Sequence, residues 1–156
     1  MTRTNRIGWA EVPDEVRPAF VVAKQALDLH TSSIVQAAAA EYLAVEDLSV
    51  TVDRARDAYR ERRDTLLAGL PDVLPAGSTW TEPEGGMFVW VRLPGRVDTT
   101  ALLEVALEHG VSFVPGAPFF AGEPDSATLR LAFTTTPPDA VAEGLRRLGV
   151  ALAATV

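Results

Sequence analysis

The chain has 156 residues, 47% of them hydrophobic, which is enough for one sizeable core or for one domain with part of another. Its net charge of −7 disfavours nucleic acid or an anionic membrane as the main partner. No apolar run approaches the ~20 residues of a membrane span and no leader opens the chain, so we expect a cytoplasmic protein.

Three residue types restrict the chemistry that the chain can support. Without cysteine there is no disulfide framework, no thiolate nucleophile and no cysteine-based metal site. His30 and His109 stand far apart and in no metal-ligand spacing, so we expect no metal. Lys24 is the only lysine. Covalent lysine chemistry must therefore use Lys24 or be absent.

The first part of the chain reads as a short strand followed by helices. An apolar run, Ile7 to Ala10, precedes a turn signal and predicts a buried strand without a strand partner nearby in the chain. Helical periodicity follows over 14–29, 34–45 and 50–70. Lys24 stands four residues before Asp28, the spacing of an ordinary surface ion pair.

Charges alternate along the predicted helix 50–70. Three pairs have helical neighbour spacing, which favours a solvated face over a basic patch: Asp53 with Arg56, Asp57 with Arg60, and Arg60 with Asp64. A loop is expected at 71–77.

From residue 50 the predicted order is α-β-β-α-β-β-α, which favours a two-layer α+β domain with helices on one face of a small sheet. The strands are expected at 78–82, 87–93, 111–114 and 128–133, with a helix after Asp98 and a last helix beginning near Pro138. We place a boundary in front of the long helix, dividing the chain into 1–48 and 49–156.

Arg130 is the clearest candidate for binding chemistry. Leu129, Leu131 and Phe133 alternate as in a half-buried strand, so Arg130 is expected on the opposite face. A guanidinium held on a strand presents a rigid, charged fork that matches a carboxylate with two hydrogen bonds. The alternative from the strand alone is an arginine in water at a sheet edge.

Several motifs stand in the order and approximate spacing of the C-terminal half of fold type I aminotransferases. They are Arg6-Ile7-Gly8-Trp9, Gly85-Gly86-Met87-Phe88-Val89-Trp90, Phe113-Val114-Pro115-Gly116 with Phe119-Phe120, and Leu129-Arg130-Leu131. The chain resembles the class I/II subgroup of 2-aminoadipate-type aminotransferases and MocR-type regulators. Residues 23–32 are similar to that subgroup too.

The resemblance implies a small C-terminal α+β domain at 49–156, preceded at 1–48 by helices and one strand from the large cofactor-binding α/β domain. It implies pyridoxal 5'-phosphate as cofactor, amino acid and 2-oxo acid substrates, and a homodimer in the complete enzyme. Arg6 matches the arginine that binds the cofactor phosphate, and Arg130 matches the clamp on the substrate α-carboxylate. Phe88 and Gly86 resemble substrate-pocket positions, although a core aromatic beside a turn glycine would look the same.

The departures from the family pattern bear on activity. In the family the Schiff-base lysine lies a few residues before the position of Arg6, so it would fall upstream of Met1. Lys24, in mid-helix beside Asp28, does not fit that role. We therefore expect no catalytic residue in this chain, and a fragment that is inactive alone. The alternatives are the effector-binding half of a MocR-type regulator, or a non-catalytic dimerisation or binding module.

Overall fold

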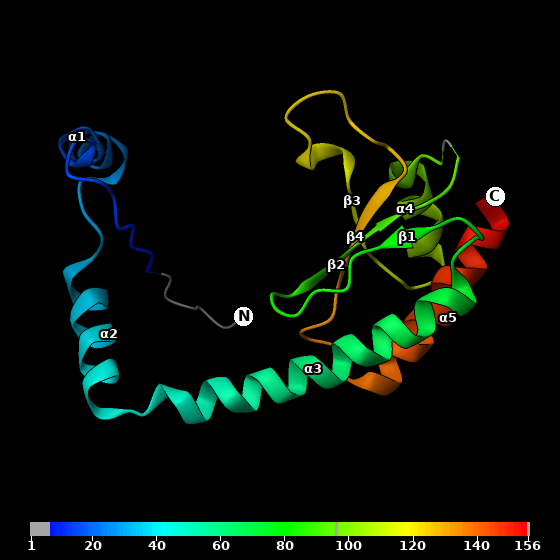
Figure 1. The fold of residues 1–156 in the computed structure, drawn as a ribbon, viewed down its shortest axis with the longest axis horizontal. Coiled ribbons are helices and arrows are strands. Elements are labelled where there is room, and N and C mark those ends of the chain that lie inside the picture. Colours follow the sequence, from blue (N-terminus) through cyan, green and yellow to red (C-terminus); the bar gives the residue numbers. More distant parts are fainter. Residues whose placement is uncertain (1–6, 96, 156) are drawn as a thin grey trace. The chain divides into compact units, whose positions relative to one another are not determined.

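The computed structural model describes residues 7–95 and 97–155, which divide between two compact units. The first unit ends at Val52 and the second begins at Asp53, four residues after the boundary expected from the sequence. Helix α3 (Leu48–Val73) contains the division (Figure 1). The described residues include no helix long and apolar enough to cross a membrane.

The first unit consists of helices α1 (Arg17–Asp28) and α2 (Ser33–Val45), neither of which buries a residue. The predicted strand at 7–10 is wrong: these residues belong to no helix or strand, and Trp9 is 92% exposed. A strand needs a hydrogen-bonded neighbour, and no described segment offers one to this run. The helices themselves are confirmed, as is the Lys24–Asp28 ion pair.

Helix α3 is longer than expected because it continues through Pro71, where the sequence predicts a loop. Proline costs an interior helical hydrogen bond, but Leu70 is fully buried on the same turn and its carbonyl still accepts from Leu74 N at 3.0 Å. Packing against the core thus outweighs the loss of one bond.

The predicted charge pairs of α3 are confirmed in two of three cases. Asp53 pairs with Arg56 at 2.9 Å and Asp57 with Arg60 at 2.6 Å, all of them well exposed. The third pair is wrong, since Asp64 is engaged by Arg63 at 2.6 Å. Arg63 also donates to the carbonyl of Pro83 at 3.1 Å, so this part of the charged face holds the loop around Pro83 to the helix.

The second unit contains a four-stranded antiparallel sheet in the order β1-β2-β4-β3 (Figure 1). The strands are β1 (Thr79–Trp80), β2 (Phe88–Arg92), β3 (Val114–Pro115) and β4 (Thr128–Ala132). Two further helices, α4 (Thr99–Glu108) and α5 (Pro138–Thr155), and a short 3-10 helix, η1 (Ala117–Phe119), complete it. The predicted order of elements is confirmed, with β3 displaced toward Pro115.

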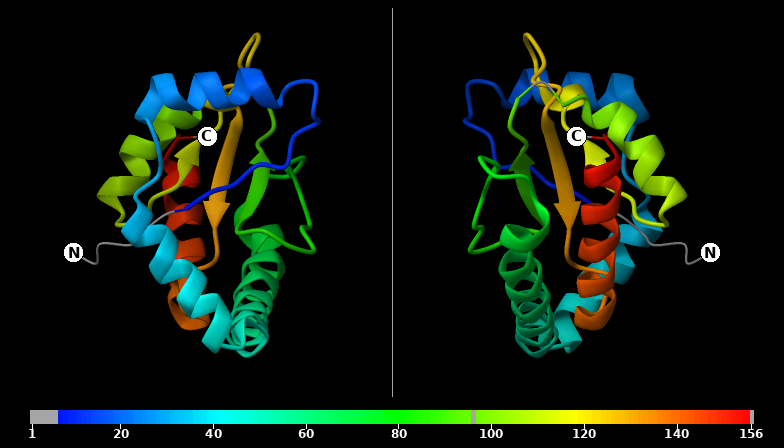
Figure 2. Two further views of the ribbon diagram at one scale, coloured as in Figure 1. Left: turned by 90° about the vertical axis from the view of Figure 1, so that its left-hand side faces the viewer. Right: turned by 90° about the vertical axis from the view of Figure 1, so that its right-hand side faces the viewer.

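The core lies between one face of the sheet and the three helices, with α5 lying along that face (Figure 2). Alternating residues of β2 and β4 and the apolar stripes of α3, α4 and α5 fill it, which confirms the two-layer α+β prediction. The core includes Leu66, Leu70, Val89, Val91, Leu102, Ala106, Leu129, Leu131, Phe133, Val141, Leu145, Leu148 and Leu152.

Local signals set the ends of α4 as the sequence predicts. The Asp98 carboxylate accepts from Thr100 N at 2.8 Å, which caps the first turn, and Gly110 follows the helix at φ 72°. The buried Thr99 hydroxyl donates to the carbonyl of Thr128 at 2.7 Å. The start of α4 is thereby tied to the start of the central strand that carries Arg130.

Candidate functional site

Arg130 stands on the central strand β4, with β2 on one side and β3 on the other. Its pairing partners are Trp90 on β2 and Val114 on β3. Leu129 and Leu131 are buried in the core, so Arg130 leaves the sheet on the opposite face, as the alternation predicts. Because β4 is not an edge strand, the alternative of an arginine at a sheet edge is wrong.

Two aromatic rings contact the guanidinium of Arg130. Its central carbon lies 4.0 Å from the ring centroid of Phe88 and 4.7 Å from that of Phe119, which are cation–π distances. The Nε–H is buried without a hydrogen-bond partner, and within the described residues the guanidinium forms no ion pair. A buried donor without an acceptor is costly, so a carboxylate supplied by a ligand would remove that cost.

Phe88 and Gly86 lie in different surroundings, although the sequence grouped them. Phe88 is 37% exposed, so it is not a core aromatic, and its ring contacts Arg130. Gly86, at φ 80°, borders a separate cavity of about 440 Å³ between the β1–β2 loop and α3. The arginines of that cavity are each paired with an aspartate of the same helix.

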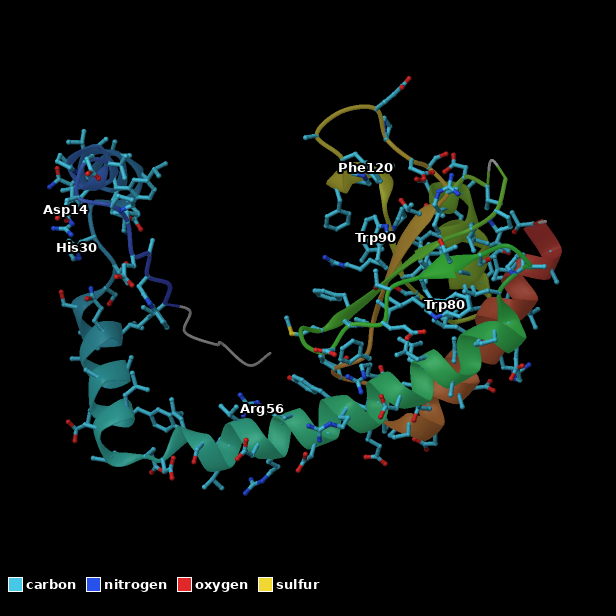
Figure 3. The ribbon with its side chains drawn as sticks, viewed as in Figure 1. Asp14, His30, Arg56, Trp80, Trp90 and Phe120 are labelled. Carbon is cyan, nitrogen blue, oxygen red and sulfur yellow. The ribbon has the colours of Figure 1, made fainter. Side chains whose placement is uncertain are left out.

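Phe119 is the contact of Arg130 that sequence reasoning did not assign. It belongs to η1, and Trp90 packs edge-on against it with ring centroids 5.6 Å apart and planes at 87°. The ring centroids of Trp90 and Phe120 are 6.3 Å apart. Figure 3 shows these two aromatic side chains on the same side of the sheet. The Phe119-Phe120 pair after a Pro-Gly turn was visible in the sequence, but its contact with β4 depends on strand order.

A second arginine on this face, Arg92, organises the loop that leads into β4. Its Nε donates to an Asp125 carboxylate oxygen at 2.7 Å, and Ala127 N donates to the other oxygen at 3.1 Å. The hydrogen bond from Arg92, followed by that from the Ala127 amide, lowers the pKa of Asp125 below its usual 3.8 and outweighs partial desolvation.

The lowered pKa of Asp125 predicts that the stability of the fold depends on pH. A carboxylate whose pKa is lower in the folded state stabilises the fold above its unfolded pKa and loses that contribution as pH falls through the folded value. We expect Asp125→Asn to lower the urea midpoint at pH 7, with a difference that shrinks below about pH 4. Asp72→Asn, at an exposed position on α3, serves as the control. A difference that persists unchanged at pH 2 would contradict this account.

The remaining sequence candidates, Arg6 and Lys24, belong to the first 52 residues of the chain. Arg6 lies outside the described residues, so its match to the phosphate-binding arginine stays a prediction. Lys24 is on α1 in its ion pair with Asp28, both side chains about half exposed. Among the described residues no group of histidines and carboxylates could hold a metal ion.

Fold and site together define a small α+β domain in which Arg130 lies between aromatic rings, without an ion-pair partner among the described residues, on the sheet face opposite the core, here called the open face. The chain belongs to the family "Aminotransferase class I and II", whose model matches residues 3–148. It is 42% identical over 147 residues to the 2-aminoadipate transaminase of Thermus thermophilus, and 40% identical over 143 residues to aromatic-amino-acid aminotransferase 1 of Thermococcus litoralis.

These matches cover 94% and 92% of this chain but only 37% and 34% of the two relatives, so the chain spans about a third of their length. The same proportion holds for a solved structure. The Thermus thermophilus α-aminoadipate aminotransferase LysN, in complex with N-(5'-phosphopyridoxyl)-L-leucine, superposes with a TM-score of 0.82 at 42% identity, covering 90% of this chain and 36% of that one. The fold type I resemblance is confirmed.

A regulator also matches. The uncharacterised HTH-type transcriptional regulator YdfD of Bacillus subtilis is 28% identical over 145 residues, which is 93% of this chain and 30% of that protein. The match shows that the same stretch occurs in a protein named as a regulator as well as in enzymes.

The family's cofactor is pyridoxal 5'-phosphate, and the described residues fit it only in part. The cofactor chemistry of this family requires a lysine amine, and the only lysine of the sequence is ion-paired on α1. The described residues therefore do not supply a covalent anchor for the cofactor. Among the described residues, the guanidinium of Arg130 is a group that can form two hydrogen bonds to a carboxylate.

Proposed function

We propose that this chain is the C-terminal part of a pyridoxal-phosphate-dependent aminotransferase, which moves an amino group between an amino acid and a 2-oxo acid. Arg130 binds the α-carboxylate that both substrates share. The observation that carries this proposal is the guanidinium itself, held on a central strand against Phe88 and Phe119 with a buried Nε–H that lacks a partner.

The rigidity of the site explains what Arg130 contributes. A bidentate pair fixes both the position and the plane of a carboxylate, and so orients the bond to the carbon that carries the amino or oxo group. The aromatic rings around it reduce the competition from water, which strengthens the charge interaction. By the family resemblance we also assign Phe88 and Gly86 to the substrate pocket and Arg6 to the cofactor phosphate. Gly86, however, borders the cavity beside α3, whereas the ring of Phe88 contacts Arg130.

The chain alone is proposed to be inactive because its single lysine is not available as the covalent anchor. The test is to mix the purified chain with pyridoxal phosphate, reduce with borohydride and map the phosphopyridoxyl adducts by mass spectrometry. We expect Lys24 to be labelled no faster in the folded chain than in the same chain unfolded in urea. Lys24→Arg identifies the signal due to the terminal amino group.

Two other results would contradict this part of the proposal. One adduct per chain on Lys24 at low cofactor concentration, absent after unfolding, would mean that this chain has a cofactor site of its own. Transamination by the purified chain, in excess of the rate with free pyridoxal phosphate, would contradict the proposed inactivity directly.

A second candidate is the effector-binding half of a MocR-type regulator, which the match to YdfD favours. Both candidates use Arg130 to recognise a carboxylate. They differ in what the complete protein does, because a regulator binds DNA in response to its ligand whereas an enzyme turns the ligand over. In the complete enzyme we propose a homodimer, as the resemblance implies.

A further inference from the structure

Trp90 and Arg130 are directly paired across strands β2 and β4. Side chains of paired residues lie on the same face of a sheet within contact distance, so the indole and the guanidinium leave the open face as neighbours. The backbone of Trp90 is itself fixed, because its N–H donates to the Thr81 hydroxyl at 3.0 Å and its carbonyl accepts from Thr81 N at 2.9 Å. The backbone of Trp90 is thus fixed beside the strand position of Arg130.

The ring of Phe119 contacts both Trp90 and Arg130. Phe119 stands at the end of η1, is 51% exposed, and its backbone N–H is held by Gly116 at 2.9 Å. The ring of Phe119 meets Trp90 edge-on, with ring centroids 5.6 Å apart and planes at 87°, and its centroid lies 4.7 Å from the guanidinium carbon of Arg130.

We propose that Trp90 is a positioning residue for Arg130, acting through Phe119. The indole holds the Phe119 ring, and the ring, together with Phe88, confines the guanidinium by cation–π contact. Arg130 therefore meets a carboxylate already ordered, and less side-chain entropy is lost on binding. The consequence for affinity rests on the proposed function of Arg130, whereas the ordering of Arg130 does not.

The experiment follows the Nε–H of Arg130 in the ¹⁵N-labelled chain, assigned by its loss in Arg130→Lys. Two quantities are measured, the rate at which this proton exchanges with water and the affinity for 3-phenylpropionate. The variants are Trp90→Leu, Trp90→Phe and Phe119→Leu. Phe120→Leu is the matched control, because Phe120 contacts Trp90 but makes no ring contact with Arg130.

We expect Trp90→Leu and Phe119→Leu each to accelerate exchange of the Arg130 Nε–H several-fold. Each should also weaken the binding of 3-phenylpropionate by about threefold to tenfold. Trp90→Phe keeps a ring edge against Phe119, so its exchange rate and affinity should stay close to those of the unsubstituted chain. Phe120→Leu should change neither the exchange rate nor the affinity. The double variant Trp90→Leu/Phe119→Leu binds no more weakly than Phe119→Leu, because Trp90 acts only through that ring.

Unchanged exchange and affinity in a folded Trp90→Leu chain would overturn the proposal, as would an equal effect of Phe120→Leu or independent effects in the double variant. If Trp90→Leu does not fold, unchanged exchange in Phe119→Leu overturns it. Absence of any 3-phenylpropionate binding to the unsubstituted chain would instead count against Arg130 as a carboxylate clamp, while the exchange rates would still decide the positioning role.

Discussion

Arg130→Gln is expected to weaken binding of 3-phenylpropionate to this chain by about 10- to 100-fold, because it removes hydrogen bonds from a charged donor that contribute roughly 1.5–3 kcal/mol. Glutamine keeps a planar polar end but has neither the charge nor the paired donors of the guanidinium. The affinity is measured by titration, following the Trp90 indole N–H by nuclear magnetic resonance.

Two controls isolate the effect of charge at this position. Arg146→Gln removes an arginine from the exposed face of α5, where it pairs with Glu143 at 2.7 Å, and should leave the affinity unchanged. The neutral ligand 3-phenylpropionamide should bind the unsubstituted chain and Arg130→Gln equally. Equal binding of the carboxylate by both would show that the aromatic rings, and not the guanidinium, hold the ligand.

Gly116→Ala is expected to lower the free energy of unfolding by about 1–3 kcal/mol, as in other overpacked sites. Gly116 is buried against β4, and its N–H donates to the Thr128 carbonyl at 2.7 Å. An added Cβ would lie 2.1 Å from the Thr128 hydroxyl and 2.8 Å from the Thr128 carbonyl oxygen. Neither can withdraw, because Thr128 is buried and its hydroxyl is bound to the Asp125 carbonyl.

The substitution should also reach the site, since η1 begins directly after Gly116 and carries Phe119. We therefore expect weaker 3-phenylpropionate binding together with the loss of stability, measured by urea unfolding and by titration. Gly122→Ala is the matched control, because nothing lies within 4 Å of the added Cβ there. A Gly116→Ala chain as stable as Gly122→Ala would show that the turn can move away from β4.

Most elements of the second unit could be predicted from the sequence because each buries one face in a single core. Buried residues recur every second position on β2, as Val89 and Val91 do, and every third or fourth position on α5, as Leu145 and Leu148 do. This spacing can be read from the sequence. The end of α3 could not be predicted, because Pro71 locally favours a break and only packing around Leu70 shows why the helix continues.

The first unit shows the limit of the same reasoning. An apolar run such as Ile7 to Ala10 forms a strand only if another strand is present to pair with it. None of the described segments pairs with this run. Its helices are local structures with their own periodicity, so they could be predicted without knowing what covers them.

The candidate site was predictable as far as single residues but not as a set. Strand alternation put Arg130 on the open face, and the family motif brought in Phe88, which does contact it. Gly86 lies instead at the cavity beside α3. Phe119 reaches Arg130 only because β3 pairs with β4, a fact of topology that residue spacing does not contain.

We propose that this chain supplies the carboxylate-binding part of an aminotransferase. The most direct test of this proposal is a chimera in which the chain replaces the matching residues of the Thermus thermophilus 2-aminoadipate transaminase, to which it is 42% identical over 147 residues. From the family resemblance we expect the part of that enzyme retained in the chimera to carry the Schiff-base lysine.

The measurement is kcat/KM of the chimera for transfer of the amino group from L-2-aminoadipate to a 2-oxo acid. We predict activity that depends on pyridoxal phosphate, that falls by roughly 30- to 1,000-fold in the Arg130→Gln chimera, and that is unaffected by Arg146→Gln. A folded chimera that binds the cofactor but has no activity, or one whose activity survives Arg130→Gln, would contradict the claim.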